Sequence, residues 1–182
     1  GDGTISLVDK TLMKETQRTY VGKEPHHLMI TPDGSELIVA NAASNDLVLL
    51  DPKSGAIKRR VSNISDPYQL GYSPDRKWFV SVSLRLDRVD IYHGGDFKLA
   101  KRIALGKTPS HVTFDSGSRY AFVTLQDSDE IAAIDLARLE VMWKMKVGKL
   151  PAGIFMTPDD QYLFIGVMGQ DYVEVIDWRK QK

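Results

Sequence analysis

Residues 21–41 read VGKEPHHLMITPDGSELIVAN, and this stretch decides the fold because two apolar runs flank a turn signal. Residues 26–31 (HHLMIT) predict one β-strand. The segment Thr31-Pro32-Asp33-Gly34 then fits a type I turn, with Pro at its second position and Gly at its fourth. Residues 36–41 (ELIVAN) predict a second strand that is apolar on both faces, which favours burial on both.

Two further strands follow this pair. Residues 47–50 (LVLL) predict a third strand and residues 56–61 (AIKRRV) a fourth, with turn-forming residues before and after the third. Turn signals roughly every 8–12 residues, without helical periodicity, are typical of an all-β chain.

This four-stranded unit recurs with a period of 42 residues and no gap in register. The repeated positions are Pro25, Pro67, Pro109 and Pro151; Pro32, Pro74 and Pro158, with Ser116 in the missing place; and Asp9, Asp51, Asp135 and Asp177, with His93 in the missing place. A four-stranded repeat of this length has the size of one β-propeller blade. The repeated Asp comes before a turn, where its side chain is expected to accept hydrogen bonds from the backbone.

We therefore predict an all-β fold, a β-propeller of four-stranded antiparallel blades, with about four blades present as part of a larger ring. The chain is expected to form one partial propeller domain over residues 1–182. Its parts are a half blade at 1–20, blades at 21–62, 63–104 and 105–146, and an incomplete blade at 147–182.

An incomplete ring would expose an apolar blade face at each end. Three arrangements could deal with those faces. The chain could be a fragment of a longer protein, two copies could associate as a homodimer, or four blades could close alone. We favour the first.

Composition narrows the function classes. Lys and Arg number 24 and so do Asp and Glu, so the chain lacks the basic excess of a nucleic-acid-binding protein. The absence of Cys excludes a disulfide, a thiolate zinc site and covalent c-type haem attachment within these residues. No apolar run approaches the roughly 20 residues that a membrane-spanning helix needs.

The pattern Val-Gly-x-x-Pro followed by Pro-Asp-Gly in residues 21–34, and the Val-Thr strand with its Asp-containing turn in residues 122–131, resemble the YVTN-type β-propeller repeat. The resemblance covers nearly the whole chain. It implies a periplasmic or extracellular protein of bacteria or archaea. Families that share the repeat include the haem-d domain of cytochrome-cd nitrite reductases, surface-layer-associated proteins, lactonases and amine dehydrogenase large subunits. Because these functions differ, function has to be argued from a site.

The two positions after each repeated Pro vary between repeats, whereas the core positions stay apolar. We predict that they lie at one end of the central channel and form a ligand site. The candidate residues are His26, His27, Tyr68, Gln69 and His111. The resembled haem-d domains carry a Pro-His segment that lines the haem pocket, and Pro25-His26 and Pro109-Ser110-His111 are similar to it. We assign no metal ligands.

The favoured function is an extracytoplasmic binding or interaction module, whose partner is a protein or a small molecule at the channel end. The alternative is a haem-d-type oxidoreductase domain, with haem as the candidate cofactor. A lactonase-like hydrolase is a weaker alternative. We assign no catalytic residues, because no Ser, His and Asp stand in a recognisable nucleophile context.

Overall fold

The computed structural model describes all 182 residues, which form seventeen strands and one short 3-10 helix. The chain divides into two compact units, residues 1–68 and 69–182, and the boundary falls inside strand β7. The all-β prediction is confirmed, and the strands of residues 26–61 lie within one residue of their predicted bounds.

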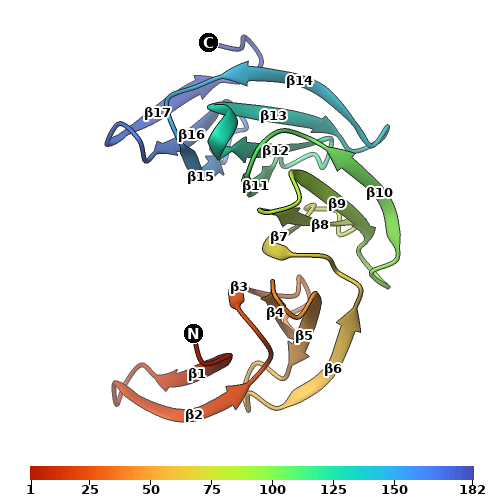
Figure 1. Cartoon of the computed structure of the whole chain (residues 1–182), viewed down its shortest axis with the longest axis vertical. Coiled ribbons are helices and arrows are strands. Elements are labelled where there is room, and N and C mark those ends of the chain that lie inside the picture. Colours follow the sequence, from red (N-terminus) through yellow and green to blue (C-terminus); the bar gives the residue numbers. More distant parts are fainter. The chain divides into compact units, whose positions relative to one another are not determined.

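The first unit contains two sheets and the start of β7 (Figure 1). Every strand pair in these sheets is antiparallel. The two-stranded sheet is formed by β1 (Thr4–Asp9) and β2 (Lys14–Tyr20). The four-stranded sheet is formed by β3 (Pro25–Ile30), β4 (Leu37–Asn41), β5 (Asp46–Leu50) and β6 (Ile57–Ser62).

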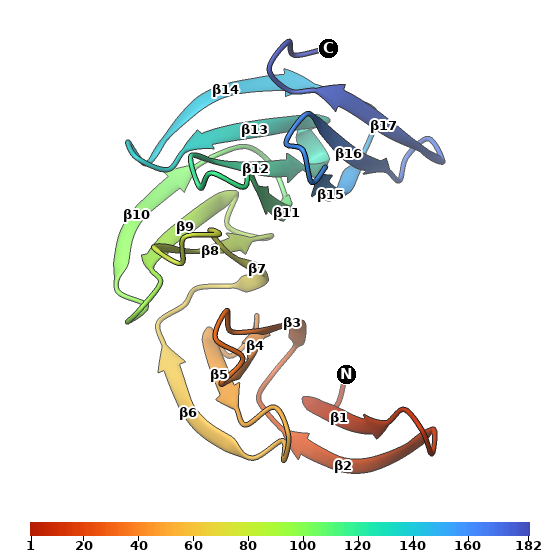
Figure 2. The ribbon, with the colours of Figure 1, turned by 180° about the vertical axis from the view of Figure 1, so that it is seen from behind.

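The second unit holds three sheets that follow one another in chain order, as Figures 1 and 2 show from opposite sides. The first is formed by β7 (Pro67–Tyr72), β8 (Trp78–Ser83), β9 (Arg88–His93) and β10 (Leu99–Ala104). The second is formed by β11 (Pro109–Phe114), β12 (Tyr120–Leu125), β13 (Glu130–Asp135) and β14 (Glu140–Lys146), with helix η1 (Gln126–Ser128) after β12. The third has only β15 (Pro151–Met156), β16 (Tyr162–Val167) and β17 (Tyr172–Asp177).

The core of the second unit lies between neighbouring sheets, because each sheet is apolar on both faces. One cluster joins Val80 and Ile91 to Val112 and Val123 across the first and second sheets. A second cluster joins Phe122 to residues of the third sheet, among them Ile165. Phe122 is fully buried, and its ring centroid lies 6.0 Å from that of Trp143 and 5.0 Å from that of Trp178.

The repeated Asp at the end of the third strand, which only the repeat with His93 lacks, accepts backbone hydrogen bonds, as predicted. Oδ1 of Asp51 accepts from the N–H groups of Lys53 and Ser54, at 3.0 and 2.7 Å. Oδ1 of Asp135 accepts in the same way from the two N–H groups that follow it in its turn, at 2.8 and 2.9 Å. These bonds fix the turn that leads into the fourth strand. One residue of this turn has a positive φ, and it recurs every 42 positions. That residue is Met13, Gly55, Phe97, Leu139 or Gln181.

Ser116 stands where the other repeats have Pro, and the structure gives a reason for this difference. Its N–H and its hydroxyl both donate to the carboxylate of Asp160, which belongs to the next repeat. Proline has neither group, so this departure from the repeat adds a link between two sheets of the second unit.

Candidate functional site

The first strand begins with a break in its hydrogen-bond ladder in three of the repeats. In β3, β11 and β15 the register shifts between the repeated Pro and the residue three positions later. The two residues between them are therefore left out of regular pairing with the second strand. These are the two variable positions that the sequence singled out, and the irregularity sets them apart from the ladder around them.

One side chain holds the loop that precedes this irregularity. The side chain comes from the turn between the second and third strands of the preceding repeat. Oδ1 of Asn45 accepts the N–H of Asp66 at 2.8 Å, and Oδ1 of Asp87 accepts the N–H of Thr108 at 2.9 Å. Oδ1 of Asp129 accepts the N–H of Leu150 at 2.9 Å. We call Asn45, Asp87 and Asp129 the latch residues. Each of them, and each residue that it holds, has positive φ. The latches fix where the variable residues begin.

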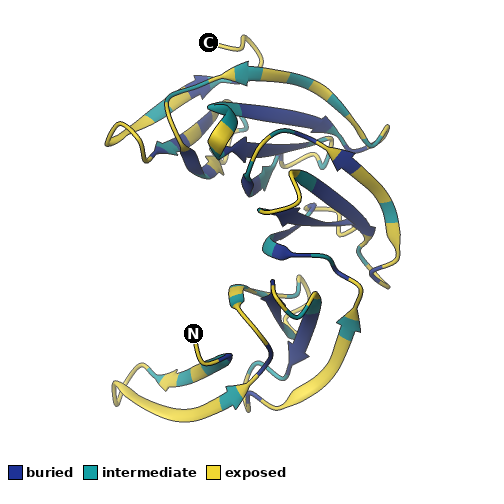
Figure 3. Cartoon of the chain, in the orientation of Figure 1, coloured by how far each residue is buried: buried dark blue, intermediate teal, exposed yellow.

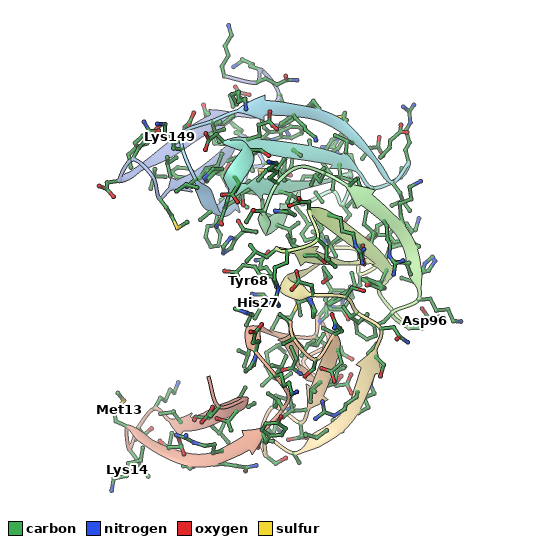
Figure 4. The ribbon with its side chains drawn as sticks, in the orientation of Figure 1. Met13, Lys14, His27, Tyr68, Asp96 and Lys149 are labelled. Atoms are coloured by element: carbon green, nitrogen blue, oxygen red, sulfur yellow. The ribbon has the colours of Figure 1, made fainter.

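In the first unit the structure brings His26 and Tyr68 together. Their ring centroids lie 4.8 Å apart with an interplanar angle of 51°. His26 is exposed, while Tyr68 and the neighbouring His27 are partly buried. Figure 4 labels Tyr68 and His27. The pair places an imidazole next to a phenol ring and so offers a small aromatic surface.

In the second unit Gln69 and the segment that contains His111 lie side by side. Oε1 of Gln69 accepts the backbone N–H of Val112 at 2.6 Å. Nδ1 of His111 lies 3.2 Å from Oγ of Ser110, and that hydroxyl lies 3.0 Å from Oγ1 of Thr124. Thr124 in turn donates to a backbone carbonyl of β15 at 2.8 Å. The imidazole is thus attached to a chain of hydroxyl groups that spans two sheets.

The hydroxyl chain is buried, and this changes the chemistry of the imidazole. Ser110 and Thr124 are both fully inaccessible to solvent. Removal of water around His111 lowers the pKa of its ring, because burial disfavours the charged form. His111 is therefore neutral at physiological pH, and neutral imidazole is the form that binds metals and accepts protons.

Thr124 was missed by the sequence analysis, although a signal was present. The equivalent positions in the other repeats are Ala40, Val82 and Gly166, so Thr124 is a single polar residue in an apolar column. A buried hydroxyl needs a partner, and here it has Ser110 and the β15 carbonyl.

The approach of His111 to His26 and His27 stays a prediction, since His111 belongs to the second unit and the other two to the first. No group of three or more His, Asp or Glu side chains in the chain could hold a metal ion. Imidazole is one of the side chains that can ligate a haem iron, and an imidazole oriented through its other nitrogen, as His111 is by Ser110, suits that role. No helix of the chain is long and apolar enough to cross a membrane.

Comparisons with known proteins agree with this architecture. An uncharacterized protein of Staphylococcus saprophyticus is 26% identical over 73% of this chain and 43% of its own length. The 6-phosphogluconolactonase of Bacillus subtilis is 21% identical over 86% of this chain and 53% of its own length. The chain thus spans about half the length of these relatives.

Among solved structures, dihydro-heme d1 dehydrogenase NirN in complex with DHE matches 100% of this chain and 40% of its own. The TM-score is 0.76 and the identity 18%, a likeness that shows the fold alone. The family model described as YNCE-like beta-propeller matches residues 1–182. The propeller fold expected from the repeat is therefore confirmed, and the chain belongs to the YNCE-like beta-propeller family.

Proposed function

We propose that this chain is part of an extracytoplasmic binding module, and that its ligand contacts the irregular starts of the first strands. The observation that carries the proposal is the buried hydroxyl chain behind His111, from Ser110 to Thr124. Buried polar groups cost stability unless they are paired, so a polar network that fixes one imidazole favours a role for that imidazole.

The residue types suit recognition of a small ligand. His26 and Tyr68 supply an aromatic surface, and His27 lies next to them on β3. Gln69 lies on β7, and its side-chain oxygen accepts the backbone N–H of Val112, the residue after His111 on β11. Aromatic surface with a few fixed polar groups is the usual make-up of small-molecule sites.

Haem or a related flat macrocycle is the second candidate ligand. In the second unit, the His111 imidazole, with one nitrogen near a hydroxyl, suits an axial ligand. In the first unit, the tilted His26–Tyr68 pair separately suits contact with a flat ring. The structural likeness to NirN, described in complex with DHE, supports testing this ligand.

The test is a titration of the purified protein with haem and, separately, with Zn²⁺. The variant His27→Ala/His111→Ala removes the two imidazoles at the second variable position. His93→Ala is the matched control, because His93 is exposed at the outer end of β9. We expect binding by wild type and by the control, with at least about tenfold weaker binding by the double variant, a loss of about 1.4 kcal/mol.

Binding that the double variant leaves unchanged would remove these histidines from the site. If neither probe binds wild type, the small-molecule form of the proposal fails and a protein partner becomes the better reading. Hydrolysis of 6-phosphogluconolactone by wild type would show an enzyme in place of a binding module, in line with the name of the Bacillus subtilis relative.

A further inference from the structure

A cavity of about 430 Å³ opens where the second and third sheets of the second unit meet. It lies at the first residue of β12, whereas the segment of His111 pairs with the last residues of that strand. Figure 3 shows β14, which borders the cavity, as alternating exposed and half-buried residues beside the buried β13. The lining side chains that matter here are Arg119, Tyr120, Trp143, Trp178 and Arg179. We call this the tryptophan cavity.

Both tryptophans of the cavity depart from the repeat. The positions equivalent to Trp143 hold Gln17, Arg59 and Lys101. The positions equivalent to Trp178 hold Lys10, Pro52, Gly94 and Leu136. Two aromatic residues that a single repeat carries thus meet at one cavity. Aromatic lining with a few polar groups is typical of small-molecule sites, and a feature present in one repeat only is not needed to build the other sheets.

The charged side chains at the tryptophan cavity are cations, and one of them is unpaired. Nε of Arg119 donates to the carboxylate of Asp115 at 3.0 Å, so the charge of Arg119 is balanced. The guanidinium of Arg179 lies 4.4 Å from the centre of the Trp178 ring and donates to the backbone carbonyl of Asp160, and no carboxylate forms an ion pair with it. No Asp or Glu side chain lines the cavity, so its lining carries one uncompensated positive charge.

The chain contains its own comparison, a cavity of about 290 Å³ at the equivalent place between the first and second sheets. There Leu136 and Ala137 stand at the positions of Trp178 and Arg179. Two carboxylates also line this earlier cavity. Of the two cavities, only the tryptophan cavity therefore combines an unpaired cation with a lining free of carboxylates.

We propose that the tryptophan cavity binds a small planar carboxylate, an aromatic ring that carries one carboxylate group. The unpaired guanidinium of Arg179 matches a single negative charge, and a guanidinium can donate two parallel hydrogen bonds to a carboxylate. The half-buried ring of Trp143 offers aromatic surface against which a planar body can pack. A volume of about 430 Å³ is within the usual range of small-molecule sites.

The test is calorimetric titration of the purified protein with 2-naphthoate. Its neutral counterpart 2-naphthamide tests the contribution of the charge, and acetate tests the contribution of the ring. We expect 2-naphthoate to bind with a Kd below about 1 mM, and 2-naphthamide and acetate to bind at least about tenfold more weakly.

Two variants carry residues that other repeats already hold at these positions. Trp143→Gln copies Gln17 and removes the ring, and Arg179→Ala copies Ala137 and removes the cation. Arg138→Ala is the matched control, because Arg138 is exposed and lies outside the cavity. We expect each of the first two variants to bind 2-naphthoate at least about tenfold more weakly, and the control to bind it like wild type.

The signals of the three indole N–H groups in a nitrogen–proton NMR spectrum locate the bound probe, because Trp78 borders the earlier cavity instead. We expect 2-naphthoate to shift the signals of Trp143 and Trp178 and to leave that of Trp78 in place. The same spectra establish that each variant is folded.

Three results would overturn the proposal: no binding of 2-naphthoate by wild type below about 1 mM, unchanged binding by both variants, or equal binding of 2-naphthamide or acetate. Neither His27 nor His111 lines the tryptophan cavity, so this proposal and the proposed function fail independently.

Discussion

The latch residue Asp129 contributes to the free energy of unfolding through two features, a side-chain hydrogen bond and a backbone with positive φ, and substitutions can separate them. Its side chain accepts the N–H of Leu150, and its backbone has a φ of 51°. Three substitutions separate these features. Asp129→Asn keeps both the acceptor and a residue that tolerates positive φ. Asp129→Gly keeps only the backbone conformation, and Asp129→Ala keeps neither.

The expected magnitudes follow from these two features. A hydrogen bond to a charged group contributes about 1.5–3 kcal/mol, and the partial exposure of Asp129 favours the lower end. A residue with a Cβ atom in the left-handed region costs about 1–2 kcal/mol, of which Asn and Asp recover a part. We therefore expect the free energy of unfolding to fall by about 2 kcal/mol in Asp129→Ala, about 1 in Asp129→Gly and under about 0.5 in Asp129→Asn.

The assay is urea denaturation followed by circular dichroism, with thermal melts in parallel. A loss of about 2 kcal/mol corresponds to a decrease in Tm of about 4–8 °C for a chain of this length. If Asp129→Asn is as damaging as Asp129→Ala, the charge of the carboxylate matters and the reasoning from acceptor geometry is wrong. If Asp129→Gly and Asp129→Ala are equal, the backbone conformation contributes nothing.

Three further outcomes are expected. Phe122→Ala should lower the free energy of unfolding by about 3–5 kcal/mol and Phe122→Leu by much less, as read by urea denaturation, because Phe122 is fully buried between two sheets. Ser116→Pro should cost about 1–2 kcal/mol in the same assay, because it removes both bonds to Asp160; a neutral result would show that this link adds no stability. The pKa of His111 is lowered from 6.5 in the folded state, so the unfolded chain binds more protons as pH falls. Wild type should therefore lose more Tm than His111→Gln between about pH 7.5 and pH 5.5, and equal losses would contradict the assignment.

The repeat could be predicted from the sequence because each turn carries its own chemical signal. Gly34 donates its N–H to the carbonyl of Thr31 at 2.8 Å, as the type I turn requires. The repeated Asp, such as Asp51 or Asp135, likewise acts within its own turn, so its role can be inferred from residues two or three positions away.

The candidate site was less accessible to such reasoning because its geometry depends on distant residues. The register shift after each repeated Pro leaves no mark in the local sequence. It accompanies a latch that lies 21 residues earlier, as Asp87 does for Thr108. Likewise, Ser110 could be seen to vary between repeats, but its partner Thr124 lies on another strand.

The spacing of the links between sheets has a consequence for synthesis on the ribosome. Gln69 bonds to Val112, and Ser116 to Asp160, over 43 and 44 residues. The second face of a newly made sheet is therefore covered only after one more repeat has been synthesised. At about 5–20 residues per second, 42 residues take about 2–8 s, during which an apolar row such as that around Phe122 is open to chaperones or to neighbouring nascent chains. The rate of translation across each repeat thus sets how long the apolar face of each new sheet stays exposed in the cell.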